Sequence, residues 1–166
     1  MSRSEGIVLT LFSLEEAGEP SKAGDTIAIR GIFKNYLAAT KNLQANLQST
    51  SPFVEVIDGS FTGGRIETGD TVSNRNTPFL VYVKENAPYN LDVVIEIVYS
   101  DTGYRAFDFV ELRVNHDYLD IRSNNLVTTA TSTGNIGYAE DYALAGSGIQ
   151  YKNQQLIYYS GLMLGS

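Results

Sequence analysis

The stretch Leu91-Asp-Val-Val-Ile-Glu-Ile-Val-Tyr99 decides the fold of this chain. Every second side chain in it is large and apolar, which is the period-2 pattern of a strand with one buried face. The members of this set are Val93, Ile95, Ile97 and Tyr99. The turn signal Asp101-Thr-Gly103 follows, and a second strand-like segment then runs over residues 104–114. The two segments predict a long antiparallel hairpin.

The apolar residues of the second hairpin strand change face along its length. Phe107 and Phe109 lie on one parity, whereas Val110, Leu112 and Val114 lie on the other. One extra residue in the strand would keep both groups on the buried face. The sequence therefore predicts a β-bulge near Phe109.

Five further strand-like segments precede this hairpin, and turn signals rich in Gly, Pro, Asn and Asp separate them. They cover residues 7–12, 27–33, 43–48, 53–57 and 79–83. No segment has a convincing helical period. About seven short strands with this spacing predict an all-β domain over residues 1–114, built as a two-sheet β-sandwich.

Residues 115–166 differ in character, because they are rich in Thr, Ser, Asn, Gly and Tyr and carry few charges. We expect a polar link first, then strands over 126–129 and 149–151. Segments 155–159 and 161–164 are expected to form a strand pair joined at Ser160-Gly161. Some 50 mostly polar residues are marginal for a core of their own. This additional C-terminal β segment is therefore interpreted as the truncated start of a following module, or as extra strands docked on the sandwich.

The composition restricts the classes of function. The net charge of −7 and the lack of a basic cluster argue against a nucleic-acid partner. The chain has no Cys, which excludes disulfides, thiol nucleophiles and thiolate metal sites. No signal peptide or apolar membrane span is visible. Both ends are interpreted as cuts in a longer polypeptide.

The sequence offers little for catalysis. His116 is the only His and thus the only imidazole base; it lies in the link beside Asp117 and is interpreted as a solvated linker residue. Glu55 and Glu96 are candidates for an acid–base pair, but both occupy outward strand positions. The sequence therefore predicts no catalytic residue and no enzyme.

The turns and the tyrosines are the remaining candidate ligand sites. Carboxylate and amide oxygens in turns are suitable ligands for Ca²⁺. The candidates are Asp58, Asp70, Asn74, Asn76 and Asp101. No calcium-loop motif is present, so the interpretation of these residues as turn formers is favoured. Tyrosines can line a sugar or protein surface, although Trp, the usual sugar platform, is absent; those of the second block are Tyr138, Tyr142, Tyr151, Tyr158 and Tyr159. We predict no cofactor-binding or metal-binding residue, and keep calcium open as an alternative.

Several short motifs follow one another in a recognisable order. They are Ala23-Gly-Asp-Thr-Ile27 leading into Ile32-Phe-Lys-Asn35, then Ser51-Pro-Phe-Val-Glu-Val-Ile57, Ile66-Glu-Thr-Gly-Asp-Thr71, and Pro78-Phe-Leu-Val-Tyr-Val83 with Ala87-Pro88 behind it. This order resembles the bacterial accessory immunoglobulin-like modules (CARDB or adhesion type) of large exported multidomain proteins such as secreted peptidases. Asn35 is expected to cap backbone groups where its strand ends.

The resemblance implies an immunoglobulin-like sandwich without catalytic activity. It would act as a structural or adhesion module, secreted or at the bacterial cell surface, that spaces or presents neighbouring domains of the same polypeptide. A protein or glycan partner and a homodimer through exposed strand edges are further expectations. The alternative is a carbohydrate- or calcium-binding accessory module of a secreted enzyme.

Overall fold

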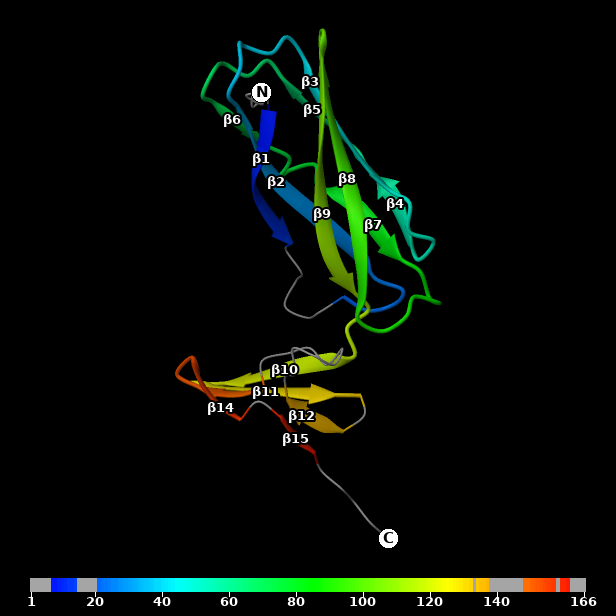
Figure 1. Cartoon of the computed structure of the whole chain (residues 1–166), viewed down its shortest axis with the longest axis vertical. Coiled ribbons are helices and arrows are strands. Elements are labelled where there is room, and N and C mark those ends of the chain that lie inside the picture. Colours follow the sequence, from blue (N-terminus) through cyan, green and yellow to red (C-terminus); the bar gives the residue numbers. More distant parts are fainter. Residues whose placement is uncertain (1–6, 15–20, 133, 138–147, 158, 162–166) are drawn as a thin grey trace, which may run out of the picture.

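The computed structural model describes residues 7–14, 21–132, 134–137, 148–157 and 159–161 (Figure 1). All regular elements in these residues are β-strands, and they form three antiparallel sheets. Among the described residues there is accordingly no helix with the length and apolarity of a membrane span.

The first sheet is organised around one long central strand. Its order is β1 (Ile7–Leu14), β2 (Thr26–Asn35), β7 (Phe79–Val83) and β4 (Val54–Asp58), and β6 (Thr71–Ser73) also pairs with β2. Strand β2 alternates between buried and half-buried residues, so its apolar positions Ile27, Ile29 and Phe33 face inward.

The second sheet contains the hairpin that the sequence predicts. Its order is β5 (Ser60–Gly64), β3 (Leu43–Ser49), β8 (Leu91–Asp101) and β9 (Tyr104–Val114). Strand β3 alternates strictly, with Leu43, Ala45 and Leu47 buried and the residues between them exposed. The predicted strands therefore exist, with ends that differ by a few residues.

These two sheets form an immunoglobulin-like β-sandwich. The order β1-β2-β7-β4 matches strands A, B, E and D of that fold, and β3-β8-β9 matches the opposite strands C, F and G, with β5 as an additional strand beside β3. Phe33 lies at the centre, stacked on Phe61 at 5.2 Å and edge-on to Tyr99 at 5.9 Å between ring centroids. Phe33 and Tyr99 are fully buried, so the two sheets close over one apolar core.

The chain crosses from one sheet to the other at Gly59, between β4 and β5. The Leu47 amide donates to the Gly59 carbonyl at 2.7 Å. A Cβ at Gly59 would lie 2.5 Å from the Leu47 carbonyl oxygen. Only glycine allows this close approach between backbones.

The predicted β-bulge near Phe109 is wrong. Strands β8 and β9 pair in one unbroken register, from Leu91 opposite Val114 to Asp101 opposite Tyr104. Phe107 and Phe109 consequently point outward and are about 60% exposed.

The inward position between the two Phe residues belongs to Asp108. The Tyr99 hydroxyl donates to the Asp108 Oδ2 at 3.1 Å. Burial, together with the Asp108 carboxylate, raises the pKa of Tyr99, so the hydroxyl keeps its proton. This hydrogen bond and the burial of Leu112 and Val114 keep the even-numbered residues of β9 facing the core. The two Phe residues alone would favour the opposite orientation of the strand.

The third sheet follows Val114 and runs across the long axis of the molecule (Figure 1). Its strands are β10 (Tyr118–Ser123), β11 (Leu126–Thr131), β12 (Asn135–Gly137), β13 (Ile149–Tyr151), β14 (Gln154–Ile157) and β15 (Tyr159–Gly161). Strand β11 lies at the centre, with β10 on one edge and both β12 and β13 on the other.

The expectations for this region are met only in part. The strands expected over 126–129 and 149–151 exist as β11 and β13. The strand pair joined at Ser160-Gly161 is wrong, because both residues lie inside β15 and pair with β12; residues 162–164 lie outside the described residues. Strand β10 occupies part of the expected polar link. Whether residues 115–166 form a module of their own stays a prediction.

Candidate functional site

The link between sandwich and third sheet, residues 115–117, is a hydrogen-bonded junction rather than a loose tether. Asn115 is 5% exposed and adopts a left-handed backbone with φ of 52°. Its side chain accepts from the Ala23 amide at 3.0 Å and donates to the Ala87 carbonyl at 2.6 Å. Its own carbonyl accepts from the Asn90 amide at 2.9 Å. One residue thus ties the end of β9 to two loops of the sandwich.

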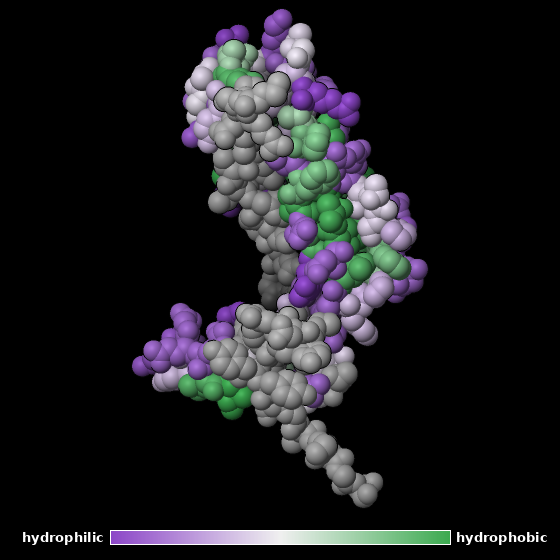
Figure 2. All heavy atoms as spheres, in the orientation of Figure 1, coloured by the Kyte–Doolittle hydropathy of each residue, from purple (hydrophilic) through white to green (hydrophobic). Residues whose placement is uncertain are grey.

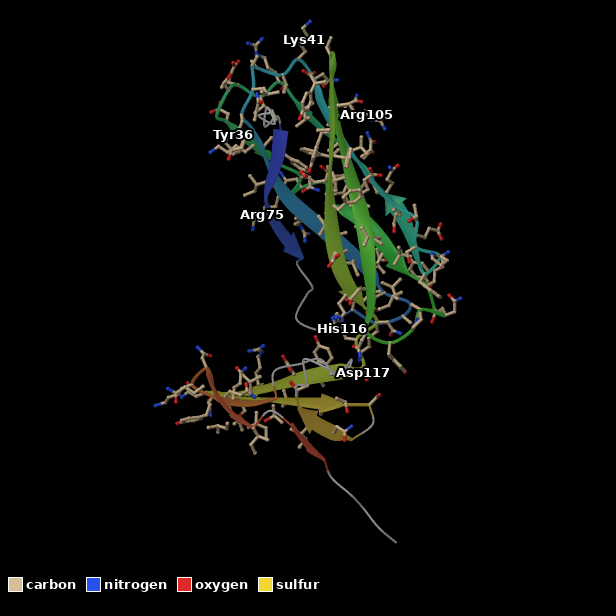
Figure 3. The ribbon with its side chains drawn as sticks, in the orientation of Figure 1. Tyr36, Lys41, Arg75, Arg105, His116 and Asp117 are labelled. Atoms are coloured by element: carbon tan, nitrogen blue, oxygen red, sulfur yellow. The ribbon has the colours of Figure 1, made fainter. Side chains whose placement is uncertain are left out.

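His116 is buried, and its interpretation as a solvated linker residue is wrong. Its backbone amide donates to the Ser21 carbonyl at 2.9 Å, and its ring stands edge-on to Tyr118 at 5.1 Å. Figure 3 shows His116 and Asp117 where the sandwich meets β10. The sequence could not place Ser21 here, because the contact joins residues 95 positions apart.

Asp117 pairs with a sandwich loop instead of orienting His116. The Asn90 side chain donates to the Asp117 Oδ1 at 2.8 Å, and the Asp117 amide donates back to the Asn90 Oδ1 at 3.3 Å. On the other side, the Asp117 carbonyl accepts from the Ser132 amide at 2.8 Å. Asp117 therefore connects the sandwich to the third sheet directly.

Sequence reasoning missed Asn90 and Asn115 as functional positions. Both have positive φ, 53° and 52°. Asn tolerates this conformation better than most residues, because its short amide hydrogen-bonds locally. The sequence signal for such a position is an Asn outside any helix. Asn is so common in turns that this signal does not identify a junction.

A cleft of about 540 Å³ lies at the junction. Residues of the sandwich, the link and the third sheet line it, among them Lys22, Tyr89, His116 and Thr131. The amide of Asn115 and the carboxylate of Asp117 already serve the junction. The cleft therefore marks the seam between the two parts of the chain.

The third sheet exposes one apolar face. Directly paired residues of neighbouring strands share a face, and the register places Leu119, Ile121, Leu126, Ile149, Tyr151 and Ile157 together. Five of them, all except Ile149, are between 39% and 52% exposed. No apolar side chain described beyond Val114 is buried. We call this set the third-sheet face; it has the pattern of a core surface but lacks a cover in the described residues.

A second apolar surface lies on the outer side of β8 and β9, and we call it the β9 face. Figure 2 shows hydrophobic residues gathered over these two strands. The members are Val94, Val98, Phe107 and Phe109, and the two Phe rings meet edge-on at 5.5 Å. An adjoining groove of about 240 Å³ is smaller than the roughly 300 Å³ at which small-molecule pockets begin. The surface therefore suits a protein partner better than an enclosed ligand.

Two polar pairs lie at the β9 face, and Glu96 of one pair is located between Val94 and Val98, opposite Phe109. Arg113 donates to both carboxylate oxygens of Asp92, at 2.8 and 2.9 Å, and Gln48 donates to Glu96. The bond from Arg113 lowers the pKa of Asp92. Asp92 and Arg113 are thus ion-paired, whereas Glu96 is hydrogen-bonded to an uncharged amide.

The two carboxylates weighed for catalysis lie on different sheets. Glu55 is exposed on β4, whereas Glu96 is on β8 and bonded to Gln48. The structure thus does not bring them together as an acid–base pair.

The calcium candidates occupy separate turns. Asp101 accepts from the Lys41 and Asn42 amides at 3.0 and 2.8 Å, and Asp58 accepts from the Ser60 amide at 3.2 Å. Asn74 is buried and bonds the Gly31 amide and the Ile29 carbonyl. Asp70 and Asn76 are exposed. No group of three acidic, His or Cys side chains gathers within the described residues.

The capping role predicted for Asn35 is confirmed. Its fully buried amide donates to the Ala38 and Ile66 carbonyls, both at 3.0 Å, and accepts from the Leu37 amide. Of the tyrosines, Tyr151 belongs to the third-sheet face; Tyr138, Tyr142, Tyr158 and the side chain of Tyr159 lie outside what the structure describes.

No protein-family model matches the chain, and no curated protein is significantly similar to it. Among solved structures, the crystal structure of a FixG-related protein from Vibrio parahaemolyticus aligns with a TM-score of 0.42 and 10% identity, over 68% of this chain and 97% of that chain. A likeness of this size supports no functional argument, and the fold rests on the strand pairing described above.

Proposed function

We propose that this chain is a non-catalytic structural module of a larger exported or cell-surface bacterial protein. Its task is to hold a neighbouring domain of the same polypeptide at a fixed distance and orientation. The exported setting follows from the resemblance of the motifs over residues 23–88 to accessory immunoglobulin-like modules. The mechanical role follows from the junction.

The junction is the observation that carries this proposal. A flexible tether exposes its backbone and side chains to solvent, whereas Asn115 and His116 are buried. Hydrogen bonds from residues 115–117 reach Ser21, Ala23, Ala87, Asn90 and Ser132. Such a network leaves the two parts of the chain little freedom to turn against each other.

The third-sheet face supplies the contact for the neighbouring domain. Exposed apolar sheet surface of this kind is normally covered by another layer. A second sheet or a helix with an apolar side would bury Ile121, Leu126 and Tyr151 together. The sandwich would then act as a rigid arm, and the third sheet as the seat for what it carries.

The roles of the candidate residues support the non-catalytic part of the proposal. The imidazole of His116 is packed against Tyr118. Glu55 and Glu96 lie on different sheets.

Distance measurements between two spin labels test the rigid arm. The chain has no Cys, so Asn46→Cys on β3 and Ser123→Cys on β10 place labels uniquely. We expect one narrow distance distribution, which broadens in Asn115→Gly because the amide bonds are lost while the backbone conformation is kept. Asn76→Ala, in an exposed turn, is the matched control and should change nothing. A broad distribution in the labelled parent chain would contradict the proposal.

A photo-crosslinker at Ile121 in intact bacteria tests the seat. The expected product joins Ile121 to a residue of the same polypeptide outside residues 1–166. Crosslinks to other proteins alone, or no crosslinks, would contradict the proposal that the third-sheet face carries a neighbouring domain of the same polypeptide. A glycan array and a calorimetric calcium titration should both be silent; saturable binding in either would favour the carbohydrate- or calcium-binding alternative.

A further inference from the structure

We propose that the β9 face is a dimer interface for a second copy of this chain, with the two β9 strands facing each other in antiparallel orientation. This surface belongs to the sandwich and not to the third sheet. The inference is therefore independent of the rigid-arm function, and either can fail without the other.

Four of the five outward side chains of β9 form a stripe whose two halves complement each other. In order, they are Arg105, Phe107, Phe109 and Glu111; the fifth, Arg113, lies beyond the stripe in an ion pair with Asp92. At about 3.4 Å per residue, the stripe is about 20 Å long, and its midpoint is Asp108. A two-fold axis through this midpoint places Arg105 of one copy on Glu111 of the other, and Phe107 on Phe109.

The charges at the ends of the stripe are available for a partner. Arg105 and Glu111 are exposed, and neither has an ion-pair partner among the described residues. Their cross-strand neighbours, Ser100 and Val94, are uncharged. By contrast, Arg113 further along the same strand is already paired with Asp92. Of the three outward charges on β9, the two that a second copy would match are thus the ones without an ion pair in the described residues.

The charges at the two ends of the stripe favour the same axis. Val94 and Val98 lie beside it on β8 and extend the apolar surface. The alternative two-fold axis, parallel to β9, would place Arg105 on Arg105 and Glu111 on Glu111. Like charges in direct contact disfavour that arrangement, so complementarity selects the antiparallel one.

Asp108 decides between contact through the face and contact through the strand edge. Edge-to-edge pairing of two β9 strands about the same midpoint would set the two inward Asp108 side chains directly opposite each other. Opposed like charges destabilise a strand pair, and an inward charge is a known protection of edge strands. Face-to-face packing leaves each Asp108 on its own Tyr99 hydroxyl. We therefore infer stacking of the faces, not the strand-edge homodimer expected from the sequence.

The test is the association of two charge-reversed chains. Arg105→Glu and Glu111→Arg each create two repulsive contacts in their own homodimer. In the mixed dimer, both contacts are restored. Each reversal alone should weaken dimerisation in sedimentation equilibrium by about tenfold or more. In native mass spectrometry of a mixture with one chain isotope-labelled, the mixed dimer should predominate strongly over both homodimers.

Matched controls separate this interface from other association. Arg65→Glu and Glu67→Arg make the same charge changes on an exposed pair of the sandwich away from β9 and should leave the dimer unchanged. Phe107→Ala should weaken the dimer by about 30-fold or more, because a central aromatic contact is lost twice. Self-association through the third-sheet face would not respond to the charge at residues 105 and 111. A monomeric parent chain, or reversals that neither weaken nor rescue the dimer, would overturn the proposal.

Discussion

The sandwich and the third sheet are built from the same kind of antiparallel strand, yet they differ in what covers their apolar sides. In the sandwich, inward residues such as Ile95 and Ile97 are about 1% exposed. In the third sheet, Ile121 and Leu126 are 52% and 40% exposed. Both regions satisfy their backbone through strand pairing. The difference lies in side-chain burial alone.

This difference teaches that strand pairing and alternation do not by themselves give a stable domain. A backbone hydrogen bond replaces one to water and adds little net free energy, whereas removal of apolar surface from water supplies most of the stability. The sandwich has two layers and one core. In the described residues the third sheet has one layer, so it depends on the junction and on whatever covers its apolar face.

The largest expected effect comes from the same substitution, Ile to Ala, made once in the sandwich and once in the third sheet. Ile97→Ala on β8 should lower the free energy of unfolding by about 2–5 kcal/mol, because it leaves a cavity in a packed core. Ile121→Ala on β10 is the matched control and should change it by about 0.5 kcal/mol or less. Urea unfolding followed by circular dichroism measures both. Equal losses in the two variants would show that Ile121 is as well packed as Ile97.

The buried amide of Asn74 gives the next largest effect. Asn74→Ala should cost about 2–4 kcal/mol, because the Gly31 amide and the Ile29 carbonyl each lose a buried partner. Asn46→Ala, the same change at an exposed position on β3, is the control. Urea midpoints that move equally in both variants would contradict the structural role of Asn74.

The sheet crossing at Gly59 gives a smaller effect. Gly59→Ala should destabilise the sandwich by about 1–3 kcal/mol, because the new methyl group collides with the Leu47 carbonyl. Thermal unfolding of the variant measures the loss. An unchanged melting temperature would mean that the connection between β4 and β5 moves away from Leu47 at no cost.

The smallest expected effect depends on pH. Backbone hydrogen bonds from Asn42 and Lys41 lower the pKa of Asp101 in the folded chain. Because the pKa is lower in the folded chain, the ionised carboxylate stabilises the fold at pH values above the unfolded pKa of about 3.9. This stabilisation is lost as the pH falls through the folded pKa. Asp101→Asn should therefore cost about 0.5 kcal/mol near neutral pH, an exposed-site figure, and nothing near pH 2.

Urea midpoints at the two pH values measure this difference. The control is Glu55→Gln, an exposed carboxylate without a hydrogen bond or ion pair in the described residues. A cost of Asp101→Asn that grows as the pH falls would contradict the assigned sign.

The sandwich could be predicted from the sequence to a large extent, because burial on one face imposes alternation. Residues 43–48 and 91–99 alternate so regularly that their strands and buried sides follow directly. The parity of β9 could not be predicted in the same way. A rule that puts Phe inward and Asp outward fails at residues 107–109, because the Tyr99 hydroxyl supplies a partner for an inward Asp108.

The junction and the third sheet could be predicted only in fragments. The burial of His116 depends on Ser21, and the role of Asn115 depends on Ala23 and Ala87, all distant in sequence. The expectation of a polar link misses β10, although Leu119 and Ile121 alternate with polar residues as in other strands. Such contacts between distant residues leave no local pattern.

Amide hydrogen exchange of the unmodified chain tests most directly the claim that the sandwich is stable by itself and the third sheet is not. Amides of β8, around Ile95 and Ile97, should exchange only through global unfolding and show the highest protection. Amides of β10 and β11, around Ile121 and Thr128, should exchange through a local opening at least about 100-fold faster. Protection in β10 and β11 equal to that of β8 would contradict the account, because the third sheet would then share the stability of the sandwich.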